Sequence, residues 1–100
     1  MEDFFAPAAF KPAEALVALR RQLRDLKPLV ERGTAEQPRY EWRAQAVIEL
    51  QVQEGAIAAR VADKPARSPQ WRAKTLATSS DVRGFVDEVK RQLKRWDDED

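Results

Sequence analysis

The stretch AVIELQVQEGAIAARV, residues 46–61, decides the fold. Ile48, Leu50 and Val52 alternate with polar residues, and a period of two is typical of a strand with one buried face. Glu54-Gly55 then interrupts the alternation, and glycine supplies the positive φ that a two-residue hairpin turn needs. The sequence therefore predicts a main strand over about residues 46–53 that returns on itself as an antiparallel hairpin.

A two-residue turn also fixes which side chains of this hairpin lie opposite each other. The pairs expected on the inner face are Val52 with Ile57, Leu50 with Ala59, and Ile48 with Val61. On the outer face Glu49 falls opposite Arg60, and such a cross-strand pair of opposite charges contributes about 0.2–1 kcal/mol. Apolar and charged pairs thus agree on one register.

The alternation extends upstream of the hairpin to Tyr40, which is too long for one straight strand in a small domain. We expect a bend, bulge or tight turn near residues 43–45, and whether residues 40–45 form a separate strand stays open. Downstream, Trp71, Ala73 and Thr75 alternate with polar residues and predict a further strand over about residues 71–77.

Two helical patterns flank the strands. Pro12 suits a first helical position, and the apolar stripe that follows predicts a helix over residues 12–27, with a looser turn to Arg32. That stripe consists of Leu16, Leu19, Leu23, Leu26 and Val30. Thr78, Ser79 and Ser80 offer N-cap oxygens for a last helix. Its apolar stripe is Val82, Phe85, Val86, Val89, Leu93 and Trp96.

These elements predict an α+β fold in the order α-β-β-β-α. We expect an antiparallel β-meander of three to four strands, with the N-terminal and C-terminal helices packed on one face. Its 100 residues form one domain, with residues 1–11 as an N-terminal arm and residues 97–100 as a disordered acidic tail. No apolar run is long enough for a membrane span and no signal peptide is apparent, so we expect a cytoplasmic protein.

The composition excludes much of enzyme chemistry. The chain has no cysteine and no histidine, which removes zinc sites of the usual kind, cysteine nucleophiles and histidine-based triads. Its carboxylates are interleaved with Lys and Arg, so ion pairing accounts for them, and its three glycines are too scattered for a phosphate-binding loop. We therefore expect a non-catalytic domain with no cofactor and no metal.

Surplus apolar surface favours a role in protein contacts, with a protein partner or with a second copy as a homodimer. Aromatic residues crowd the N-terminus, and small apolar residues are expected on the outer face of the sheet. The candidate interface residues are Phe4, Phe5, Phe10, Val47, Ala58 and Ala62. The alternative for the sheet residues is an ordinary solvated face.

The second hypothesis is a nucleic-acid-binding module. The α-β-β-β-α order and Pro38-Arg39-Tyr40 resemble the double-stranded-RNA-binding domain, and the resemblance implies contacts to duplex RNA. Thr78–Arg83 stand where that family has a Lys-Lys-x-Ala-Lys run, and its loop histidine has no counterpart. An electrostatic, salt-sensitive contact would instead use the basic residues Arg60, Arg67, Arg72, Lys74, Lys90, Arg91, Lys94 and Arg95.

Overall fold

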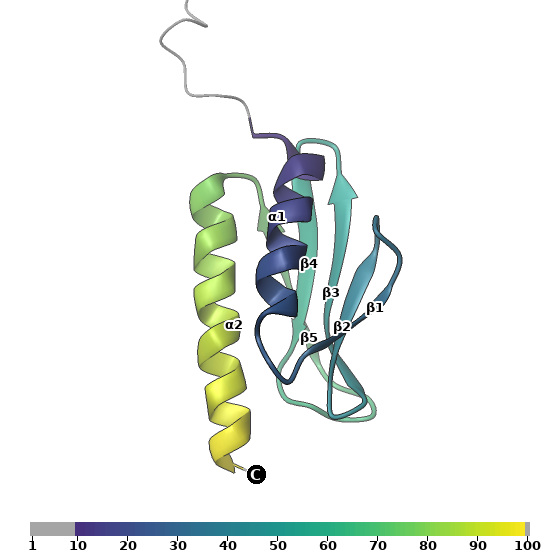
Figure 1. Ribbon diagram of the computed structural model, residues 1–100, viewed down its shortest axis with the longest axis vertical. Helices are drawn as coiled ribbons and strands as arrows, with labels where there is room; N and C mark the ends of the chain where they lie inside the picture. Colours follow the sequence, from purple (N-terminus) through teal and green to yellow (C-terminus); the bar gives the residue numbers. More distant parts are fainter. Residues whose placement is uncertain (1–9, 100) are drawn as a thin grey trace, which may run out of the picture.

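Five antiparallel strands, placed side by side in chain order, make one sheet in the computed structural model, which describes residues 10–99. The elements are α1 (Pro12–Arg24), β1 (Val30–Gly33), β2 (Pro38–Trp42), β3 (Gln45–Gln53), β4 (Ala56–Ala62), β5 (Trp71–Leu76) and α2 (Ser79–Glu99). Both helices lie on one side of the sheet and pack against each other (Figure 1). The predicted α+β class is confirmed, and the meander has five strands where three to four were expected.

The central hairpin has the predicted register. Val52 lies opposite Ile57, and Glu49 opposite Arg60. Gly55 takes a φ of +75°, the left-handed conformation that the two-residue turn requires. Local alternation and turn chemistry point to one pairing here, so the hairpin follows from the sequence alone.

The core lies between the inner face of the sheet and the apolar stripes of the two helices. Leu19 and Leu23 of α1 are fully buried, and so is Tyr40 of β2. Every predicted apolar position of α2 is buried, namely Val82, Phe85, Val86, Val89, Leu93 and Trp96. The rings of Trp42 and Trp96 meet edge to face at 6.0 Å, which joins the end of α2 to β2.

The first helix is shorter than predicted, and a strand follows it. α1 ends at Arg24, and β1 begins at Val30, which the helical stripe had included. Val30 is 46% exposed, whereas Leu29 beside it enters the core. The prediction is wrong here because Pro28 disfavours helical geometry at Lys27, and the chain then pairs with β2.

A tight turn at Arg43-Ala44 divides the long alternating segment into β2 and β3, as the sequence predicted near residues 43–45. Trp42 pairs with Gln45, so only two residues form the turn. Both have positive φ, 53° for Arg43 and 70° for Ala44. Neither is a glycine, so the turn is strained, because a left-handed conformation costs an L-residue about 1–2 kcal/mol.

This strain predicts that Ala44→Gly stabilises the protein. Glycine removes the steric cost at φ 70° and loses more unfolded-state entropy, so we expect a net gain of about 0.5–1 kcal/mol in the free energy of unfolding. Urea denaturation measures it. Ala13→Gly in α1 is the matched control and should destabilise by up to about 1 kcal/mol. An equal loss in both variants would show that Ala44 is not strained.

Val47 lies in the core, although the alternation had placed it on the outer face. Tyr40 pairs with Ile48 but Glu41 pairs with Ala46, so Val47 is an extra residue in β3. Such a bulge changes the phase of the strand, and here both Val47 and Ile48 are fully buried. The alternation of apolar and polar residues in the sequence does not reveal a bulge, so the predicted place of Val47 on the outer face was wrong.

The apolar alternation of Trp71 and Ala73 suggests that these residues face the core, but in β5 the residues between them do. Leu76 pairs with Ile57 and is buried, so Arg72 and Lys74 lie on the helix side of the sheet. Both contact Glu88 of α2, at 3.2 and 2.6 Å. Trp71, Ala73 and Thr75 therefore lie on the outer side. A shift by one residue inverts a strand, and the apolar alternation of Trp71 and Ala73 suggested the wrong phase.

The acidic C-terminus is helical as far as the structure describes it. Asp97, Asp98 and Glu99, predicted as part of a disordered tail, form the last turn of α2. Asp97 lies 3.9 Å from the Arg43 guanidinium, which also lies over the Trp42 ring. At the other end of α2, Thr78 caps the helix by accepting a hydrogen bond from the Asp81 N–H, as predicted.

Candidate interaction surface

Within residues 10–99, no helix covers the side of the sheet opposite α1 and α2. Residues on this side form rows across the strands, because directly paired residues point to the same side. One row contains Arg32, Arg39, Glu49, Arg60 and Ala73, and the next contains Gln51, Ala58 and Thr75. We call these two rows of residues the open face.

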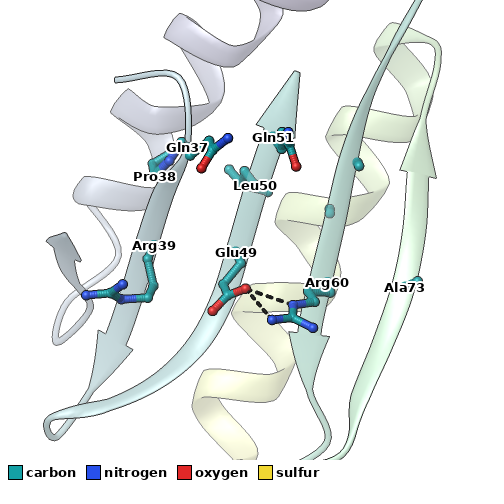
Figure 2. A pocket seen from close by; sticks show the side chains of 10 residues that line it. Gln37, Pro38, Arg39, Glu49, Leu50, Gln51, Arg60 and Ala73 are labelled. Carbon is teal, nitrogen blue, oxygen red and sulfur yellow. Dashed lines mark hydrogen bonds and ion pairs between the residues drawn. The ribbon is translucent and has the colours of Figure 1, made fainter. Parts of the chain in front are cut away.

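A charge pair lies at the centre of the open face. The Arg60 guanidinium donates to Oε1 of Glu49 from Nε at 2.8 Å, and its Nη2 lies 2.6 Å from the same oxygen (Figure 2). The guanidinium also lies over the Trp71 ring, 4.5 Å from its centroid. Both charged side chains remain accessible, 33% for Glu49 and 48% for Arg60. The predicted pair is therefore formed and available to a partner.

A shallow hollow of about 330 Å³ lies beside this pair. Gln37 and Gln51 lie at one end of it and Glu49 and Arg60 at the other, while Arg39 extends away from Glu49 (Figure 2). Its remaining walls are formed by Pro38, Leu50, Ala58, Ala59 and Ala73. Small side chains line the middle of the hollow, so another backbone or surface can approach the sheet closely.

A second hollow, of about 600 Å³, lies where the β4–β5 loop meets the open face. Arg67, Ser68 and Pro69 of the loop face Glu49 and Arg60 across it. Arg67 is exposed and makes no ion pair with any residue from 10 to 99. The loop therefore borders the open face at its Trp71 end.

The predicted interface residues do not form one surface. Phe4 and Phe5 lie outside the described residues, and Phe10 is half-buried against the core. Val47 and Ala62 are fully buried, so neither can contact a partner, and their assignment to an interface is corrected. Ala58 alone of the six lies on the open face, where it is half-buried.

The eight predicted basic residues lie in three separate places. Arg60 lies at the centre of the open face and Arg67 lies at its border, whereas Arg72 and Lys74 pair with Glu88 on the helix side of the sheet. The other four, Lys90, Arg91, Lys94 and Arg95, are exposed along α2. Arg39, which was not among the predicted contact residues, lies opposite Glu49 and so belongs to the open face.

An ion network joins α1 to the first two strands. Glu31 of β1 accepts two hydrogen bonds from Arg20, both 3.1 Å, and one from the Tyr40 hydroxyl at 2.7 Å. Arg24 donates a further bond at 3.3 Å. The bonds from Arg20 are the main reason why the pKa of Glu31 falls to about 2, and burial raises the pKa of Tyr40. These groups satisfy one another's charges and hydrogen bonds and tie α1 to β1 and β2, so the network is structural.

The structure therefore defines an α+β domain with two helices on one face of a five-stranded meander and a polar, open second face. No protein-family model, no curated protein and no solved structure matches this chain. Between residues 10 and 99 no three acidic side chains gather as metal ligands would. Over the same range neither helix combines the length and the apolar character of a membrane span.

Proposed function

We propose that the chain is a cytoplasmic, non-catalytic module that binds protein through its open face. One observation carries the proposal: a five-stranded sheet is covered by helices on one side only, and its other side combines small residues with a charge pair. A protein surface can approach closely over Ala58 and Ala73 and can bind the charged groups beside them. Depletion of lysine and enrichment of arginine are typical of such interfaces.

The acid–base groups support a non-catalytic role. Within the described part of the chain, the carboxylate with a clearly lowered pKa is Glu31, and its partners Arg20 and Tyr40 hold it in an ion network away from the open face. On the side of the sheet that carries the open face, Glu49 pairs with Arg60, and Glu41 pairs with Arg32 and Arg39. Carboxylates that are held by arginines on an accessible surface are suited to recognition, whereas acid–base catalysis needs a group that is free to exchange a proton.

Site-specific photo-crosslinking tests this proposal. A benzophenone side chain is introduced at Thr75 on the open face, or at Ala13 on the exposed side of α1 as the control, and the full chain is irradiated inside its own cells. We expect a discrete protein adduct from Thr75 and none from Ala13. Ala58→Glu should reduce the Thr75 adduct by about tenfold, because it places an unpaired charge at the centre of the contact.

Two outcomes would contradict the proposal. Equal adducts from Thr75 and Ala13 would mean that the open face is not a preferred contact. Salt-sensitive binding of duplex RNA that is lost in Arg39→Glu, together with no protein adduct, would replace it with the nucleic-acid hypothesis. A circular dichroism spectrum that is unchanged in Ala58→Glu shows that the variant is folded and makes the comparison valid.

A further inference from the structure

We propose that the partner on the open face is a second copy of this chain, related by a twofold axis that runs parallel to the strands between β3 and β4. The inference rests on the proposed function and names its partner. Face-to-face sheets pack about 10 Å apart with their strands nearly aligned. A twofold axis that lies midway between the two faces and runs between two strands sets each strand against a different strand of the other copy.

The register of the sheet shows what this axis brings together. With the axis between β3 and β4, Glu49 faces the partner's Arg60, and Arg60 faces the partner's Glu49. In the same row Arg39 faces the partner's Ala73, and in the next row Gln51 faces the partner's Ala58. Two opposite-charge contacts form, and each remaining large side chain meets a small one.

Neighbouring positions of the axis bring like charges together. An axis over β3 sets Glu49 against its own copy and Arg39 against the partner's Arg60. An axis over β4 sets Arg60 against its own copy. An axis between β2 and β3 sets Arg39 against the partner's Glu49, but it also sets Arg60 against the partner's Arg32. Like charges in direct opposition disfavour an interface, so of these four positions the charges favour the axis between β3 and β4, which brings no like charges together.

The free atoms of the central pair match this arrangement. Both contacts that Arg60 makes with Glu49 use Oε1, so Oε2 of Glu49 remains to accept a hydrogen bond from the partner's Arg60. A guanidinium has five N–H donors, and Nη1 of Arg60 remains for the partner's Glu49. Two alternating pairs would then form a closed ring of four charges, in which each charge has two opposite neighbours.

The contact is small, and this sets its strength. The β4–β5 loop borders the face at the Trp71 end, so the two rows around Glu49 and Gln51 supply most of the interface. An interface below the usual range of about 1,200–2,000 Å² binds weakly. We therefore expect dissociation constants of roughly 10–100 μM, with monomer and dimer in exchange.

Cysteine pairing between two variants tests this axis. The chain has no cysteine, so Arg39→Cys and Ala73→Cys each carry a single thiol. In the proposed dimer residue 39 faces residue 73 of the other copy across the roughly 10 Å between the two sheets. The two copies of residue 73 are farther apart, because about three strand spacings, roughly 14 Å, separate them sideways as well. A direct disulfide needs Cα atoms within about 7 Å, so a short bis-maleimide cross-linker joins the two thiols instead. We expect it to couple the mixed variants about tenfold more than either variant alone.

A charge exchange provides a second measurement on the full chain. Light scattering at about 200 μM should give a mass approaching twice 11.5 kDa for the unaltered protein. Arg60→Glu places carboxylates opposite each other and should give the mass of one chain. The double variant Glu49→Arg with Arg60→Glu exchanges the charges within and between copies, and should restore association.

The outcomes separate this inference from the proposed function. Cross-linking of the mixed variants that is no greater than that of the single variants, or no greater than in the urea-unfolded chains, would overturn the axis. A single-chain mass at about 200 μM would overturn the dimer. If Thr75 still crosslinks to a protein of another mass in cells, the proposed function stands while the dimer fails. If it gives no adduct, both fail.

Discussion

Replacement of Gly33 by alanine should lower the free energy of unfolding by about 3 kcal/mol, measured by urea denaturation. Gly33 ends β1 with a φ of +83°, where an L-residue is strained. A Cβ at this position would also lie 2.5 Å from the backbone oxygen of Gln37, which Thr34 binds through its N–H across the β1–β2 turn. The backbone of the turn must move to accept it, and the pairing of β1 with β2 weakens.

The other two glycines separate the causes of this loss. Gly55 also has a positive φ, +75°, but a Cβ there meets nothing within 4 Å, so Gly55→Ala should cost only about 1 kcal/mol. Gly84 lies within α2 with open space around it, and Gly84→Ala should stabilise by up to about 1 kcal/mol. Equal losses in Gly33→Ala and Gly55→Ala would contradict the clash at Gln37.

Glu31→Gln should cost about 2–3 kcal/mol near pH 7. The substitution removes the charge that accepts from Arg20, Arg24 and the Tyr40 hydroxyl, and it leaves these donors with weaker acceptors. The Glu31 side chain is only 18% exposed, so solvent replaces little of what is lost. Tyr40→Phe is the milder companion, since it removes one hydrogen bond and keeps the charge pairs.

The same carboxylate makes stability depend on pH in a defined window. The pKa of Glu31 is about 2 in the folded chain, against 4.5 for an unperturbed glutamate, so the folded state favours the ionised form. Its contribution is therefore fully present above about pH 5 and is lost as the pH falls towards 2. As the pH falls from about 5 to about 2, the free energy of unfolding of Glu31→Gln should decrease by about 2–3 kcal/mol less than that of the unaltered protein. Parallel stability–pH curves for the two proteins would show that Glu31 is not held as described.

Local signals were enough to predict the central hairpin and α2. The β3–β4 register follows from one alternating pattern and the Glu54-Gly55 turn, which are all local. The Glu49–Arg60 contact at the centre of the open face came with that register. Stripes with helical spacing likewise predicted which side of α2 is buried.

Features that depend on distant partners were missed. Val30 fits a helical stripe by its spacing, and only the pairing with Glu41 and the binding of Glu31 by Arg20 reveal a strand. The bulge at Val47 and the phase of β5 are set by neighbouring strands. Arg39 was missed as part of the candidate site because the bulge at Val47 shifts the register of β2 with β3, and only this shift places Arg39 opposite Glu49.

The central claim is that two copies of this protein meet through the open face, and an NMR dilution series tests it most directly. Amide ¹H–¹⁵N spectra are recorded from about 1 mM down to about 20 μM, a range that spans the expected dissociation constant. We predict that the amide signals of Glu49, Gln51, Ala58 and Arg60 shift with concentration. Signals from Ala13 on α1 and Lys94 on α2 should remain constant. Concentration-dependent shifts confined to the helices, or none at any position, would contradict the claim.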